Sequence, residues 1–130
     1  MNKSPQTIEI RHDTANDILI ARPRWTLATK ADVVAWHKNW VDLLTPYVAK
    51  KKPDIVVVLD EFRITGEAIT LWGEYRADLN KNYFGISYRV NADSKVHITT
   101  LTSGMNYNAS TAEAPTVEDA IQAILAVRRG

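Results

Sequence analysis

A continuous run of apolar residues in the middle of the chain constrains the fold more than any other feature. The run covers Ile55 to Leu59 and has an aspartate on each side, Asp54 and Asp60. It does not alternate between apolar and polar residues, as a strand with one solvated face does. A strand of this kind is buried on both faces, which requires a sheet with helices packed on it. The run therefore predicts the central strand of an α/β domain.

Two segments near the N-terminus predict a β-hairpin in the same sheet. Thr7 to His12 alternates polar and apolar side chains, which is typical of a half-buried strand. Ile18 to Arg22 is a second strand pattern, and the turn-prone residues Asp13 to Asp17 connect the two. Phe84 to Val90 has the composition of a further strand. We expect a mixed sheet that begins with this hairpin.

Three helices are predicted between and after these strands. The first follows Thr29, which with Asp32 approximates a capping box, and the last follows Thr116 and has Asp119 at the same spacing. The second is expected to begin at Thr65, as its N-cap. The apolar face of the first helix consists of Val33, Trp36, Trp40, Leu43, Leu44 and Tyr47. That of the second consists of Ala68, Trp72, Tyr75 and Leu79, and that of the last of Val117, Ala120, Ile121, Ile124 and Leu125. Alternating strands and helices predict an α/β layer fold with parallel crossovers.

The region between the last predicted strand and the last helix allows two interpretations. In Asn91 to Gly104, the β-branched residues favour a strand, whereas Asp93 or Ser94 could cap a short helix that Gly104 ends. Met105 to Thr111 is predicted to contain a short edge strand. Because the 130 residues contain no linker or repeat, we expect one domain over residues 1–130.

The composition argues against several classes of protein. The chain has no cysteine, which excludes disulfides, thiolate metal sites and cysteine catalysis. Its 16 basic and 15 acidic residues give a net charge of +1, which argues against a nucleic-acid-binding protein. The three histidines are far apart in sequence, so we expect neither a metal site nor a cofactor. No segment reads as a signal peptide or a membrane span, and we expect a cytoplasmic location.

Three segments of the chain resemble the STAS domain family, and within it the SpoIIAA-like branch. They are the strand Asp54 to Asp60, the loop and helix from Thr65 to Leu79, and the start of the last helix, Thr116 to Ile121. The resemblance covers about Thr7 to Val127, by pattern more than by identity. It implies a STAS/SpoIIAA-like α/β fold and a non-enzymatic, regulatory or protein-interaction role.

The resemblance also implies a regulatory segment. In anti-sigma-factor antagonists of the family, a serine or threonine at the start of the helix after the central strand is phosphorylated and controls partner binding. Thr65 is the nearest residue here, but the loop reads Arg63-Ile64-Thr65-Gly66 instead of Asp-Ser-Ser-Gly. A phosphate on Thr65 would be attracted by the helix N-terminus and by Arg63. The candidate partner or regulatory residues are therefore Arg63, Thr65, Gly66 and Glu67, while a plain N-cap would need the same residue type at Thr65.

Four tryptophans suggest a second function. Trp25, Trp36, Trp40 and Trp72 could line a pocket for a lipid tail or a flat apolar ligand, and some SpoIIAA-like proteins have been considered binders of apolar ligands. Core packing would account for the same residues.

Three carboxylates suggest a third function. Asp60 and Glu61 follow the central strand, where α/β folds place ligands, and Glu67 is close in sequence. Acid–base catalysis is conceivable there, but the chain has no phosphate-binding loop or nucleophile motif to support it. We therefore predict a binding protein without catalytic activity. Its partner would be a protein, with a second copy of the chain as one candidate, or a small apolar ligand.

Overall fold

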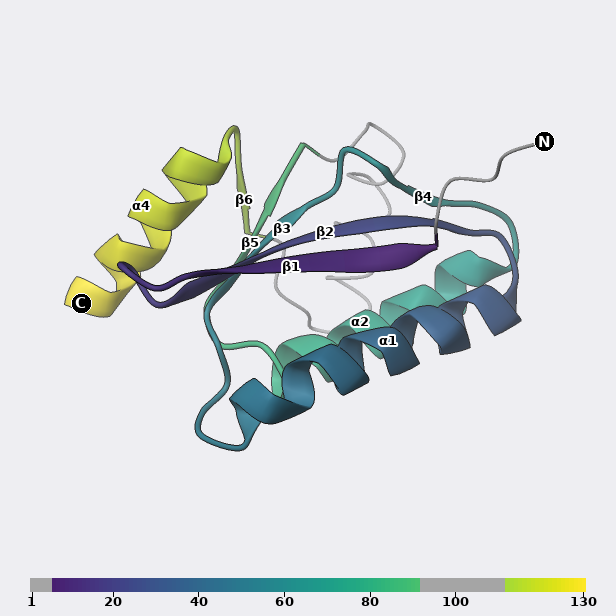
Figure 1. Cartoon of the computed structure of the whole chain (residues 1–130). Helices are drawn as coiled ribbons and strands as arrows, with labels where there is room; N and C mark the ends of the chain where they lie inside the picture. Colours follow the sequence, from purple (N-terminus) through teal and green to yellow (C-terminus); the bar gives the residue numbers. More distant parts are fainter. Residues whose placement is uncertain (1–5, 92–111) are drawn as a thin grey trace.

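A computed structural model describes residues 6–91 and 112–130, and in this part of the chain it contains one sheet of six strands and three helices (Figure 1). The strands are β1 (Thr7–Asp13), β2 (Ile18–Leu27), β3 (Ile55–Val58), β4 (Phe62–Ile64), β5 (Ser87–Val90) and β6 (Glu113–Ala114). The helices are α1 (Lys30–Val48), α2 (Ala68–Asn82) and α4 (Val117–Arg129). The predicted mixed α/β architecture is confirmed.

The sheet has the order β1-β2-β3-β5-β6. β1 and β2 form the predicted antiparallel hairpin, in which Thr7 pairs with Arg24. β2, β3, β5 and β6 run parallel to one another, as the helical crossovers require. β2 is longer than the predicted strand, and its last residues, Trp25 to Leu27, pair in parallel with the short strand β4.

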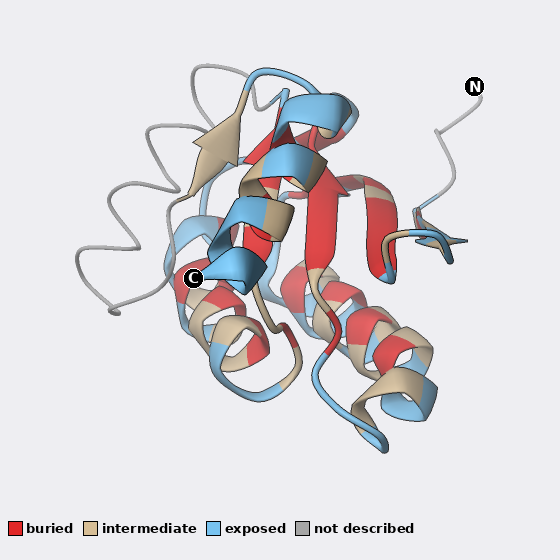
Figure 2. Ribbon diagram, turned by 90° about the vertical axis from the view of Figure 1, so that its left-hand side faces the viewer, coloured by how far each residue is buried: buried red, intermediate tan, exposed pale blue. Residues whose placement is uncertain are grey.

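The helices cover both faces of the sheet. α1 and α2 lie side by side on one face, and α4 packs on the other (Figure 1). Successive side chains of β3 alternate between the two layers: Ile55 and Val57 join the core under α1 and α2, whereas Val56 and Val58 join the core under α4. Figure 2 shows the buried residues on the strands and on the inner sides of the helices. The prediction that this strand is covered on both faces is confirmed.

Threonine side chains cap two of the three helices, as predicted. The Thr29 hydroxyl accepts from the Asp32 amide at 3.1 Å, and the Asp32 carboxylate accepts from the Thr29 amide at 3.0 Å. The Thr116 hydroxyl accepts from the Asp119 amide at 3.1 Å. Both pairs satisfy amide groups that the first turn of a helix leaves free.

The predicted N-cap of the second helix is wrong. α2 begins at Ala68 and its N-cap is Glu67, which in the described part of the chain makes no side-chain capping bond. The reason is β4, because the Thr65 amide continues the strand pairing and donates to the Leu27 carbonyl at 2.8 Å. Gly66 then turns the chain into the helix with a φ of 59°, a value that glycine adopts without strain.

The region between the last predicted strand and the last helix, for which the sequence allowed two interpretations, lies almost entirely outside the described residues. Only Asn91 of the segment Asn91 to Gly104 is described, and the strand predicted within Met105 to Thr111 also falls outside. Among the residues that are described, no helix is both long and apolar enough to cross a membrane.

Candidate functional site

The segment Arg63 to Glu67 consists of the last two residues of β4 and the turn that leads into α2. Arg63, Thr65, Gly66 and Glu67 are all exposed, whereas Ile64 is buried and anchors the turn in the core. Arg63 Nη1 donates to the Phe62 carbonyl at 2.8 Å and to the Asp60 carbonyl at 3.2 Å. The structure thus brings the four predicted residues together on one surface, with the guanidinium of Arg63 held against its own loop.

The turn lies next to the start of α1. A side-chain carbon on Gly66 would lie 3.7 Å from the Ala28 carbonyl oxygen, so the beginnings of α1 and α2 are neighbours. Ile69, in the first turn of α2, is one of the few large apolar side chains that is exposed. Glu67 places a negative charge at the positive end of the helix, which is favourable. The same charge would oppose a phosphate on Thr65.

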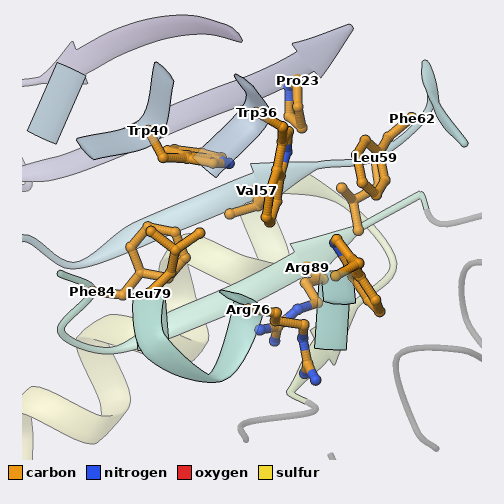
Figure 3. A pocket seen from close by; sticks show the side chains of 11 residues that line it. Pro23, Trp36, Trp40, Val57, Leu59, Phe62, Arg76, Leu79, Phe84 and Arg89 are labelled. Atoms are coloured by element: carbon orange, nitrogen blue, oxygen red, sulfur yellow. The ribbon is translucent and has the colours of Figure 1, made fainter. Parts of the chain in front are cut away.

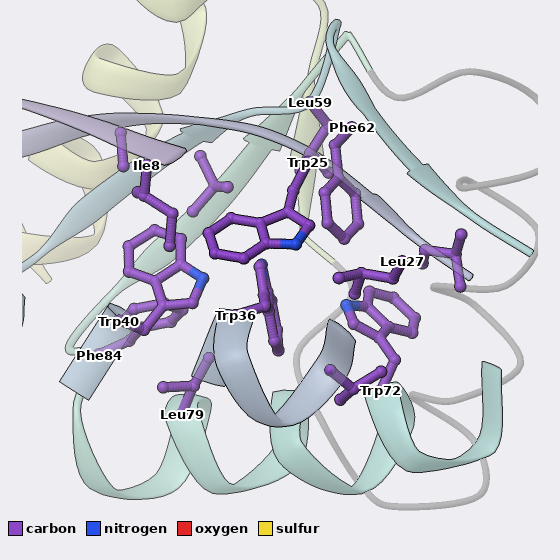
Figure 4. Close-up of a cluster of buried hydrophobic side chains, with 14 of the residues drawn as sticks. Ile8, Trp25, Leu27, Trp36, Trp40, Leu59, Phe62, Trp72, Leu79 and Phe84 are labelled. Carbon is purple, nitrogen blue, oxygen red and sulfur yellow. The ribbon is translucent and has the colours of Figure 1, made fainter. Parts of the chain in front are cut away.

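All four tryptophans lie in the core between the sheet and the helices α1 and α2 (Figure 4). Their exposed fractions are 7% for Trp25, 5% for Trp36, 1% for Trp40 and 2% for Trp72. The Trp36 ring lies 6.5 Å from that of Trp40 and 6.0 Å from that of Phe62, which in turn lies 6.2 Å from Trp72. These spacings are those of interacting aromatic rings, so the tryptophans contribute to core packing.

Three of the tryptophans also line a small pocket between the helices and the sheet (Figure 3). Its lining consists of Pro23, Trp36, Trp40, Val57, Leu59, Phe62, Trp72, Arg76, Leu79, Phe84 and Arg89. Trp25 lies in the same core but outside this lining. The volume is about 30 Å³, room for about two water molecules, whereas a cavity that takes benzene has a volume of about 150 Å³. In this conformation the pocket is too small for a lipid tail.

Two arginines that were not predicted from the sequence also line the pocket. Arg76 of α2 is 3% exposed and Arg89 of β5 is 5% exposed. Arg89 Nη2 donates to Asn80 Oδ1 at 3.3 Å, and the guanidinium carbon of Arg76 lies 5.6 Å from the centre of the Trp72 ring. The position of Arg76, four residues after Trp72 on the predicted buried face of its helix, is the sequence signal that identifies it.

Burial dominates the electrostatics of both arginines. It lowers the pKa of Arg76 to about 10, and it lowers the pKa of Arg89 to about 9, with a further decrease from the charge of Arg76. The negative charge of Glu113 in β6 partly offsets this lowering of both pKa values. The pocket is therefore apolar along most of its walls and positively charged at one end.

The three carboxylates considered for acid–base catalysis are exposed, and none of them lines the pocket beside the tryptophans. Asp60 is exposed and accepts from Arg22 Nε at 3.2 Å. Glu61 is exposed as well and is paired with Arg24, and Glu67 lies in the turn before α2. Elsewhere too, residues 6–91 and 112–130 contain no group of three or more side chains that could hold a metal ion.

Comparison with solved structures identifies the fold. The structure of the murine Solute Carrier 26 family member A9 anion transporter in the inward-facing state matches 85% of this chain with a TM-score of 0.65 and 12% identity. The fold is STAS-like. A second structure of the transporter, SLC26A9, matches 87% of this chain with a TM-score of 0.58 and 13% identity. The matched regions are 18% and 21% of those two chains, so the likeness concerns a small part of each transporter. No family model and no curated protein matches the sequence.

Proposed function

We propose that the STAS-like domain is a regulatory or protein-interaction module of the SpoIIAA-like kind, without catalytic activity. It would act in the cytoplasm and bind its partner through the exposed residues of the segment Arg63 to Glu67. The observation that carries the proposal is the exposure of this turn at the start of α2, the place where the family resemblance locates partner control.

The chemistry of the turn suits a protein partner. Arg63 offers a positive charge, Glu67 a negative charge and Ile69 an exposed apolar side chain, all close in sequence to the Thr65 hydroxyl. Mixed contacts of this kind are typical of protein interfaces, in which arginine is enriched. A phosphate on Thr65 would change the charge at the centre of this surface.

Charge reversal tests the proposed surface. The tagged full chain would be used to capture proteins from a lysate of its source organism, with quantification by mass spectrometry. We expect a partner that the wild-type chain captures and that Arg63→Glu captures at least tenfold less. Arg129→Glu, the same substitution at the exposed end of α4, serves as the matched control and should retain the partner. Equal capture by both variants would contradict the proposed surface.

Thr65→Asp tests the switch separately. If phosphorylation at Thr65 regulates binding, this substitution should also weaken capture, while Thr65→Val should not. A partner that is lost with Arg63→Glu but retained with Thr65→Asp would support the surface and exclude the switch.

The pocket favours a second candidate function, the binding of a small ligand between α1, α2 and the sheet. The apolar walls formed by Trp36, Trp40 and Trp72 support it, and the volume of about 30 Å³ requires a ligand of very few atoms or a movement of the helices. Native mass spectrometry of freshly purified protein would detect such a ligand as an added mass. Protein that always has the mass of the bare chain would count against this candidate.

A further inference from the structure

Two buried arginines lie together at one end of the pocket (Figure 3). Arg89 extends from β5 and Arg76 from α2, and each is at least nine-tenths buried. Arginine is almost never fully buried unless its charge has a partner, because removing the charge from water is costly. The hydrogen bonds of Arg89 are therefore informative about what this site could hold.

The hydrogen bonds of Arg89 are incomplete. A guanidinium has five N–H donors. Arg89 Nη2 donates to Asn80 Oδ1 at 3.3 Å, which is a long bond. Arg89 is one of the residues that line the pocket, and its Nη1 is buried and has no hydrogen-bond partner among the residues that the structure describes. A buried donor without an acceptor is a point at which a ligand oxygen would gain energy.

The charges of the cluster also favour a bound anion. Arg76 and Arg89 repel each other, which is one cause of the lowered pKa of Arg89. The charge of Glu113 attracts both guanidinium groups. The neutral side chain of Asn80 accepts hydrogen bonds from both Ser87 and Arg89 through Oδ1. A bound anion would offset the repulsion between the two guanidinium groups.

The shape of the site selects the kind of anion. A guanidinium presents its N–H groups as a planar fork that matches the two oxygens of a carboxylate. The remaining walls, among them Trp36, Phe62 and Trp72, are aromatic and suit a short alkyl group. The volume of about 30 Å³ has room for about two water-sized groups, which corresponds to an acid of one or two carbons. We propose that the pocket binds the carboxylate of such a short organic acid, with Arg89 as its principal partner and Arg76 as the second.

This proposal does not depend on the partner surface at Arg63 to Glu67, because it rests on other residues. Its test uses the full chain and sodium acetate at neutral pH. Thermal unfolding would be followed by tryptophan fluorescence in acetate and in sodium chloride at equal ionic strength. We expect acetate to raise the midpoint temperature progressively with concentration and chloride to have a smaller effect, because a ligand that binds only the folded state stabilises it. Benzoate should act like chloride, since its ring exceeds the volume of the pocket.

Arg89→Gln should abolish the difference between acetate and chloride, whereas the matched control Arg63→Gln should retain it. In case Arg89→Gln does not fold, the wild-type chain provides a second test. Nuclear Overhauser effects from the acetate methyl group to the ring protons of Trp36 and Trp72 should appear on binding. Equal effects of acetate and chloride on the wild type, an unchanged acetate response in folded Arg89→Gln, or the absence of these Overhauser effects would overturn the proposal.

Discussion

Arg128 of α4 donates from Nε to Oδ2 of Asp54, at the start of β3, over a distance of 2.8 Å. The same guanidinium donates to the backbone carbonyls of Asn16 and Asp17 in the hairpin turn. The other carboxylate oxygen of Asp54 accepts from the Ile86 amide at 2.8 Å. One pair of side chains thus links α4, the β1–β2 turn and the entries to β3 and β5.

We predict that Arg128→Ala lowers the free energy of unfolding by about 1–2 kcal/mol. The substitution removes charge-assisted hydrogen bonds from a partly buried carboxylate, and such bonds contribute about this much. Urea denaturation followed by circular dichroism would measure the change. Arg129→Ala is the control, because this neighbouring side chain is exposed. Equal losses for the two variants would show that the contact with Asp54 has no particular importance.

Gly85 gives a second prediction, which concerns the same carboxylate. A side-chain carbon added at Gly85 would lie 2.5 Å from Asp54 Oδ1 and 2.9 Å from the Lys52 carbonyl oxygen. Since the backbone carbonyl cannot move aside easily, Gly85→Ala should destabilise the fold by about 1–3 kcal/mol, the usual effect of overpacking. The loss should exceed that of Gly66→Ala, where the nearest atom is 3.7 Å away and the strain arises from a φ of 59°. The reverse order in urea denaturation would contradict the close approach at Gly85.

The capping threonines allow a third prediction. Thr29→Ala should reduce the free energy of unfolding by about 1 kcal/mol, because the hydroxyl that caps α1 is lost. Thr65→Ala should change it by less than about 0.5 kcal/mol, since Thr65 is exposed and precedes the observed N-cap of α2. Thermal or urea unfolding of both variants would measure this contrast. A loss at Thr65 as large as that at Thr29 would restore Thr65 as a capping residue.

The sequence was informative where neighbouring residues determine the structure. Five consecutive apolar residues from Ile55 favour a strand buried on both faces, and that strand was predicted within two residues of its observed bounds. The threonine caps of α1 and α4 depend on residues three positions apart, so they too could be predicted.

The sequence was uninformative where distant residues determine the structure. β4 has only three residues, and it forms because it pairs with the end of β2. The paired residues Trp25 and Phe62 are 37 residues apart in the sequence. That long-range pairing displaced the predicted cap at Thr65. Arg76 and Arg89 were missed for a related reason. An isolated arginine is normally read as a surface residue, and only the packing of α2 on β5 buries these two at the same pocket.

The hairpin turn provides a prediction about pH. A hydrogen bond with His12 at 3.0 Å, together with the charges of Lys51 and His12, holds the pKa of Asp17 below its ordinary value of 3.8. Because the pKa is lowered in the folded state, the carboxylate stabilises the fold above pH 3.8, and this contribution is lost as the pH falls through the folded-state pKa.

Asp17→Asn removes the charge while keeping a residue that tolerates the φ of 54° at this position. Urea denaturation should therefore show the wild type as the more stable protein at about pH 5, with a difference that shrinks as the pH falls to about 2. His12→Gln is the matched variant and should weaken the same pH dependence. A difference between wild type and Asp17→Asn that is constant from about pH 5 to about pH 2 would show that the turn does not depend on the charge of Asp17.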